Sequence, residues 1–299
     1  MRQRFWLAPA IVFVVALAVY LRTAPAGLTW AHDSADGGDL IAAALVRGVP
    51  HPSGYPTFIL LARLFTRLPW HTPAWQVTLI SMLSGAAAAA LTAATVQHLA
   101  GQTGDSGVSE RASRHPSDEG AEEPAIGWRS SIVSSLLFMT PGIIAGLALA
   151  FSPLLWGQAT VAEVYALNAC LATLVIWALV RWRYSAMSGW AVVAGVAFGV
   201  ALGNHLTSIW LTPLVAICLI MPPVQPARRV RAVASFALAT CAGLLVYGYL
   251  PLAASSSCLN HSFCLAPSMD LFASSFFFCS SRSLRRSVTM NFTRPTSKV

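Results

Sequence analysis

Thr29-Trp30-Ala31-His32-Asp33-Ser34-Ala35-Asp36-Gly37-Gly38-Asp39-Leu40 places three carboxylates within seven residues. The stretch follows the first hydrophobic segment of a chain that is otherwise mostly apolar. Carboxylates beside a bilayer are energetically costly, and they are usually retained for catalysis, ion binding or substrate capture. This stretch is therefore the first candidate for a functional site.

The composition predicts an integral membrane protein. Hydrophobic residues make up 56% of the 299 residues and charged residues only 10%, against about 25% charged in an ordinary globular protein. The formal net charge of +8 does not indicate nucleic-acid binding, because the arginines are scattered between apolar segments and form no basic face. The cysteines show no metal-ligand spacing.

Apolar runs predict an all-α membrane protein with about seven transmembrane helices. Two short apolar stretches, Leu40–Val46 and Thr57–Leu68, are too short to cross and predict interfacial or re-entrant helices between the first two spans. The first run has the length of a signal peptide, but no cleavage site stands out, so we expect a retained helix. The spans are expected at about 5–20, 76–99, 132–151, 161–180, 190–202, a stretch ending at 221, and 232–252.

The domain organisation is read from changes in composition. We expect residues 1–254 to form the membrane domain, with a polar cytoplasmic loop at about 100–129 that carries six acids. Residues 255–299 contain twelve serines and three of the six cysteines but no glycine or tryptophan. This change predicts a disordered tail that comes from a frameshifted or truncated gene, which leaves the activity of the chain open.

Arginines in the loops predict the orientation. A cytoplasmic N-terminus also places the arginines of 181–183 and 228–231 in the cytoplasm, and we expect a bacterial plasma-membrane protein. The same alternation puts residues 33–56, 152–163 and 203–207 on the exoplasmic face. Three polar segments that are distant in sequence are therefore expected to form one composite site.

Four of the eleven acids lie outside the polar loop and the tail: Asp33, Asp36, Asp39 and Glu163. Each has a simpler alternative role. Asp33 and Asp36 could act only as turn or N-cap residues, and Glu163 could offset the dipole of the helix that follows it. An unpaired, buried Glu163 would nevertheless cost roughly several kcal/mol.

Small residues recur in the fifth expected span. Gly195, Gly199 and Gly203 are spaced four residues apart. This spacing places them on one helix face and predicts close approach of a neighbouring membrane helix.

Several sequence blocks together resemble a known family. They are Asp36–Leu40, Gly48–Pro56, Phe151-Ser152 with Trp156 and Gln158, Glu163–Asn168, and Gly203-Asn204-His205. The family is a multi-pass one, long catalogued as a domain of unknown function, that includes the eukaryotic transmembrane O-mannosyltransferase of receptor IPT domains. It is similar in architecture to GT-C glycosyltransferases. The resemblance covers roughly residues 5–254, and Asp39 and Ser53 stand where the family usually has glutamate and proline.

The resemblance implies transfer of a sugar, such as mannose, from a polyprenyl-phosphate carrier to a hydroxyl of a protein or glycan acceptor on the exoplasmic face. It implies Asp36 as the base with Asp39 and Asp33 as alternates, and Glu163 as an orienting group. It implies no metal and no cofactor beyond the lipid-linked sugar, although Asp36 and Asp39 could hold a cation. The residues that it implies in substrate binding are His51, Tyr55, Arg47, Arg63, Gln158, Tyr165, Asn204 and His205.

Two other classes of function stay open from the sequence. A transporter or channel would use the same acids for ions, but internal repeats and matched broken helices are missing from the pattern. A non-catalytic membrane scaffold would tolerate the loss of all four acids. A solitary histidine such as His205 could also be a packing residue.

Overall fold

The computed structural model describes residues 5–114, 128–185, 187–221 and 225–259. These residues form helices and connecting segments without a strand, which confirms the expected all-α class. The chain divides into two compact units, Met1–Ser257 and Cys258–Val299. The expected disordered tail lies almost entirely outside the described residues.

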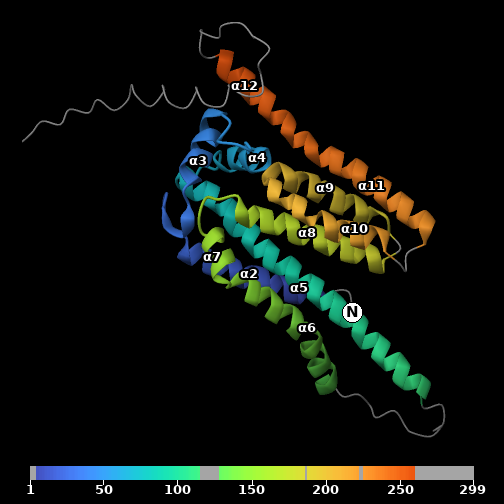
Figure 1. Ribbon diagram of the computed structural model, residues 1–299. Coiled ribbons are helices and arrows are strands. Elements are labelled where there is room, and N and C mark those ends of the chain that lie inside the picture. The colour runs from blue at the N-terminus through green and yellow to red at the C-terminus, as the bar shows by residue number, and fades with distance from the viewer. Residues whose placement is uncertain (1–4, 115–127, 186, 222–224, 260–299) are drawn as a thin grey trace, which may run out of the picture. The chain divides into compact units, whose positions relative to one another are not determined.

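The described part of the first unit is a bundle of helices (Figure 1). The elements in chain order are α2 (Leu7–Thr23), η1 (Ala31–Asp33), α3 (Gly37–Val46), α4 (Pro56–Phe65), α5 (Pro73–Arg114), α6 (Trp128–Ala150), α7 (Pro153–Ala159), α8 (Tyr165–Tyr184), α9 (Gly189–Asn204), η2 (Leu206–Leu211), α10 (Thr212–Ile220), α11 (Pro226–Leu244), η3 (Leu245–Gly248) and α12 (Tyr249–Leu259), the last of which extends past the unit boundary.

Within the described residues, three helical segments have the length and apolar character needed to cross a membrane: Pro73–Gln102, Tyr165–Tyr184 and Pro226–Ser255. A fourth is possible if Phe138–Ala150 and Pro153–Ala159, which meet at an angle of 65°, count as one span. The expected number of seven is not confirmed. The other expected spans coincide with α2, α9 and the η2–α10 pair, which are apolar but shorter than 18 residues.

The surface of the bundle fits a membrane environment. Large apolar side chains such as Val14, Ile144, Ile217 and Leu238 are exposed on different helices. Apolar patches of this kind in water mark contact surfaces or cause aggregation. Lipid contact removes that cost, so the apolar helices support a membrane protein.

The polar segment expected as a loop at 100–129 is partly helical. Helix α5 continues through Arg114, so the first half of this segment was predicted incorrectly. Adding a turn to an existing helix needs no new nucleation, and the sequence has no proline between Pro73 and Pro116. Residues 115–127 lie outside the described part of the chain.

The glycine pattern of α9 produces the expected close approach. Helix α9 packs along α11. A Cβ atom on Gly195 would overlap the carbonyl oxygen of Phe236, and one on Gly199 would overlap that of Thr240. The two backbones therefore meet with no room for a side chain at these positions, which confirms the prediction from the spacing.

The short helices α3 and α4 form one end of this unit, as the sequence predicts for two non-spanning helices (Figure 1). Leu40 of α3 and Phe58 and Ile59 of α4 are fully buried in a shared core. Thr57 donates a hydrogen bond to the carbonyl oxygen of Val200 in α9, at 2.8 Å. These contacts fix the N-terminal end of α4 beside the end of α9 where the other polar segments lie.

Candidate functional site

The acidic segment meets the link between α7 and α8. The backbone N–H of Asp36 donates to Oε1 of Glu163 at 3.2 Å, across 127 positions of sequence. The hydroxyl of Ser81 in α5 donates to the carbonyl oxygen of Glu163 at 3.1 Å. A Cβ on Gly37 would lie only 3.2 Å from the carbonyl oxygen of Ala162. Glycine at this position therefore permits the close contact that joins the two segments.

The carboxylate of Asp36 is available for chemistry. Asp36 occupies the N-cap position of α3, but its side chain makes no capping hydrogen bond. The simpler role of a capping side chain is therefore not the one that the structure shows. The side chain is 44% exposed, and its Oδ2 lies 3.4 Å from Nε2 of His51.

Asp39 holds His51 in place. Its Oδ2 accepts the backbone N–H of His51 at 2.9 Å and lies 2.8 Å from the ring Nδ1. When Nδ1 carries the proton, the ring donates to Asp39 and leaves Nε2 to accept from the hydroxyl of Tyr55, 3.1 Å away. This arrangement places the imidazole between two carboxylates and a phenol, where it can accept or donate a proton.

An aromatic surface lies beside the carboxylates. The ring of Tyr55 stacks on that of His205, with centroids 5.9 Å apart, and Tyr165 lies 5.5 Å from His205. Tyr165 is 47% exposed. Burial lowers the pKa of His205, so at neutral pH its ring is neutral. Burial, with a smaller contribution from the charge of Asp36, raises the pKa of Tyr55 and keeps its hydroxyl protonated.

Two predicted binding residues also make structural hydrogen bonds. Asn204 is fully buried, and its Nδ2 donates to the carbonyl oxygen of Val164 at 3.0 Å. Gln158 donates from Nε2 to the carbonyl oxygen of His32, also at 3.0 Å. These contacts hold in place the segments that carry Glu163 and the acidic residues, so both side chains help to position the site.

Glu163 is buried, whereas Asp36 and Asp39 are partly or fully exposed. Its side chain is 1% exposed, and its Oε2 has no hydrogen-bond partner among the described residues. Burial raises the pKa of Glu163 from 4.5 to about 7, although the N–H of Asp36 opposes the shift by favouring the charged form. Glu163 therefore changes its protonation state near neutral pH.

Replacing Glu163 by glutamine is expected to stabilise the protein at high pH. Because the folded state binds the proton more tightly than the unfolded chain, the stability contributed by Glu163 is complete below pH 4.5 and is lost as pH rises through about 7. The loss is at most about 3 kcal/mol for a shift of this size. Melting curves of the detergent-solubilised proteins between pH 4 and 8 should show that the melting temperature of Glu163→Gln rises relative to that of the parent as pH increases.

The same substitution at Glu110 is the matched control, because this acid belongs to the polar 100–129 segment. Its melting curve should follow that of the parent throughout. Parallel curves for Glu163→Gln and the parent between pH 5 and 8 would show that Glu163 does not titrate in this range.

The structure does not bring Arg47 and Arg63 to the carboxylates. Arg47 is the C-cap of α3, and Arg63 lies in the last turn of α4, whereas Asp39 and Tyr55 lie at the N-terminal ends of these helices. Asp33 belongs to η1, and its side chain lies outside the described part of the structure. The predicted site is therefore divided, with the acids and the arginines at opposite ends of one helix pair.

No group of three His, Cys, Asp or Glu side chains within the described residues has the geometry to hold a metal ion. The absence of a metal in the reaction stays a prediction from the family resemblance.

The sequence interpretation also left Arg67 out of the site. Arg67 follows Arg63 by four residues, and within the expected helix of residues 57–68 this spacing would place both side chains on one face. That spacing was the available signal, although α4 ends at Phe65.

The comparisons with known proteins agree with the resemblance. The family model described as the Protein O-mannosyl-transferase TMEM260 N-terminal domain matches residues 36–228. The Protein O-mannosyl-transferase TMEM260 of Mus musculus is 29% identical over 246 residues, which cover 80% of this chain. The chain spans 29% of the length of that mouse protein. No solved structure matches the chain significantly.

Proposed function

Because this chain belongs to the family of the Protein O-mannosyl-transferase TMEM260 N-terminal domain, we propose that it is a membrane glycosyltransferase. It transfers a hexose such as mannose from a polyprenyl-phosphate carrier to a hydroxyl of a protein or glycan acceptor on the exoplasmic side. The observation that carries the proposal is the meeting of Asp36, Asp39 and His51 with the buried Glu163. Neighbouring, partly exposed acids and a histidine are groups that can carry out the proton transfer in glycosyl transfer.

Asp36 is the base in this proposal. Its carboxylate is half exposed and carries no capping bond, so an acceptor hydroxyl can reach it. The acceptor oxygen forms its bond to the anomeric carbon while its proton passes to Asp36. The bond between that carbon and the phosphate oxygen breaks, and the phosphate leaves with the electron pair. The products are the glycosylated acceptor and the polyprenyl phosphate.

His51, with the phenol of Tyr55, is the group that faces the leaving phosphate. The two side chains are 3.1 Å apart and adjoin Asp36. With a proton on both ring nitrogens, His51 keeps its bond to Asp39 and offers Nε2–H as a further donor, and the Tyr55 hydroxyl is then also free to donate. Donors that are aimed where charge develops lower the barrier because they need no reorganisation during the reaction. Asp39 fixes the ring of His51, and Asp33 and Asp39 are the alternative bases.

Tyr165 and His205 add aromatic surface beside this group of side chains. Their rings and that of Tyr55 are in contact and partly exposed. A sugar ring presents C–H groups that pack on such surfaces and hydroxyls that reach nearby carboxylates. Glu163 orients the acidic segment, because its Oε1 accepts the backbone N–H of Asp36 at 3.2 Å.

The test uses the purified chain in nanodiscs with a panel of polyprenyl-phosphate sugars that carry a labelled hexose. Label is followed from lipid into protein acceptors and, by hydrolysis, into water. Transfer of one sugar well above that of the others supports the proposal. Intact donors throughout, together with ion flux in liposomes that requires Asp36 and Asp39, would assign the acids to transport instead. Intact donors without flux would indicate a scaffold.

A further inference from the structure

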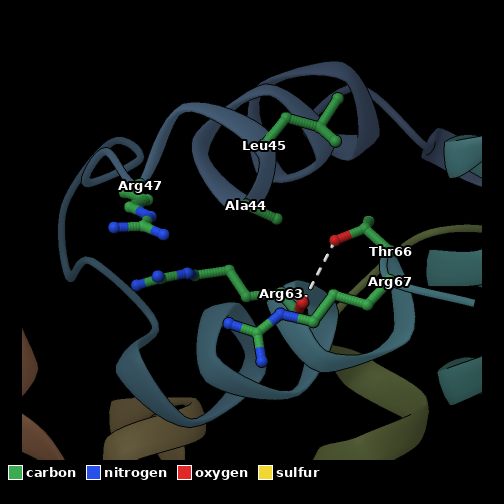
Figure 2. Close-up of a pocket in the computed structure, with 6 residues that line it drawn as sticks. All are labelled: Ala44, Leu45, Arg47, Arg63, Thr66 and Arg67. Carbon is green, nitrogen blue, oxygen red and sulfur yellow. Dashed lines mark hydrogen bonds between the residues drawn. The ribbon is translucent and has the colours of Figure 1, made fainter.

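Three arginines converge on a pocket at the C-terminal ends of α3 and α4, away from the carboxylates at the N-terminal ends. Arg47, Arg63 and Arg67 line a pocket of about 230 Å³ together with Ala44, Leu45 and Thr66. Figure 2 shows the three guanidinium groups on the same side of the two helix ends. None of the described residues that line this pocket is acidic.

The charge of the pocket is not neutralised within the described chain. The ion pairs found among the described residues join His51 to Asp36 and Asp39, and none includes these arginines. The C-terminal ends of the two helices contribute roughly −0.5 charge each. Three guanidinium groups therefore leave an excess of about two positive charges, which is more than capping of the helix dipoles requires.

Backbone and packing hold two of the arginines in position. Arg47 adopts a left-handed conformation with φ of 58°, a conformation that L-residues rarely adopt and that usually selects glycine. Arg63 is half buried and lies over the ring of Tyr249, 5.6 Å from its centroid. The hydroxyl of Tyr249 donates to the carbonyl oxygen of Gly48 at 2.8 Å, which ties this platform to the turn after Arg47.

Apolar side chains lie beside the charged pocket. Leu45, Val46 and Leu64 are 52%, 74% and 57% exposed, and they belong to the same last turns as the arginines. Positive charge next to exposed apolar surface on short helices suits the region between headgroups and acyl chains. A small free anion would pair with the arginines but would make no favourable contact with these apolar side chains.

We propose that this arginine pocket binds the phosphate headgroup of a membrane lipid, at a site separate from the carboxylates. Asp39 and Arg47 stand eight residues apart along α3, which is about 12 Å of helix. The leaving phosphate of a glycosyl donor is bonded directly to the anomeric carbon, so the phosphate in this pocket is a different one. Planar guanidinium groups pair with phosphate oxygens in bidentate fashion, and the bound lipid anchors α3 and α4 to the membrane surface.

The test is native mass spectrometry of the detergent-solubilised full chain, titrated with dihexanoyl phosphatidic acid. The variant R47Q/R63Q/R67Q is expected to bind this lipid at least tenfold more weakly than the parent. Arg22→Gln is the matched control, because Arg22 is an exposed arginine in the last turn of another helix, α2, and it should bind as the parent does. Arg67→Gln alone changes one exposed side chain, and it should weaken binding about threefold even if the triple variant does not fold.

Competition identifies the ligand. Inorganic phosphate at the same concentration should leave the lipid bound, and dihexanoyl phosphatidylcholine should bind much more weakly than phosphatidic acid. Displacement by inorganic phosphate would make the pocket a free-anion site. Equal binding of the two lipids, or equal binding by Arg67→Gln and Arg22→Gln, would overturn the proposal. Asp36→Asn should retain the lipid, which separates this proposal from the proposed sugar transfer.

Discussion

Asp36→Asn is expected to lower sugar transfer by about 10²–10⁴-fold, the range that general-base catalysis contributes. Asparagine keeps the size of the side chain and the backbone N–H that binds Glu163, but its amide cannot accept the acceptor proton. The loss should appear in the turnover rate, with little change in donor binding, because the proton moves only as the new bond forms. Transfer of label from the lipid-linked hexose is the measurement.

Two further variants decide whether the assignment to Asp36 is right. Glu110→Gln removes a carboxylate from the polar 100–129 segment and should transfer sugar like the parent. Asp39→Asn should be impaired less than Asp36→Asn, since Asp39 acts through the ring of His51. If Asp36→Asn keeps more than a tenth of the parental rate while Asp39→Asn is inactive, then Asp39 is the base.

Gly199→Leu is expected to destabilise the protein by about 3 kcal/mol, the upper part of the usual range for overpacking. Atoms of the α11 backbone, including the carbonyl oxygen of Thr240 and the Cα of Gly243, occupy the space that a side chain on Gly199 would need. Backbone atoms cannot rotate away, so the helices must separate. The apparent melting temperature should fall by roughly 6–12 °C for a unit of this size.

Gly189→Leu is the matched control in the same helix. Gly189 begins α9, and a Cβ there would meet nothing within 4 Å. The same side chain should therefore change the melting temperature little. Similar losses at both positions would mean that leucine harms α9 for a reason other than its contact with α11.

The location of the helices was largely readable from the sequence. Apolar runs follow directly from composition, and Pro56 and Pro73 each begin a helix where their missing N–H is harmless. The glycine spacing in α9 predicted a close helix contact because four residues return to nearly the same helix face. The number of spans was harder to predict, since several apolar helices are shorter than the roughly 20 residues that a crossing needs.

The candidate site was only partly predictable. Local sequence identified the rare acids and the neighbouring histidines, because unpaired charge is costly in an apolar chain. It assigned Asn204 and Gln158 to substrate but did not show that their amide nitrogens donate to backbone carbonyls. Composition cannot show whether a polar side chain faces a recess or a neighbouring backbone.

The sequence by itself determined that this is an all-helical, apolar chain of the O-mannosyl-transferase family, with three of its eleven carboxylates gathered within seven residues before the second long helix. The tertiary structure alone decided that Glu163 lies beneath Asp36, where burial raises its pKa to about 7. It also decided that the arginines lie away from the acids, because α3 and α4 carry the two groups at opposite ends. Periodicity fixes which residues share a helix face, but contacts between distant segments depend on how the helices pack.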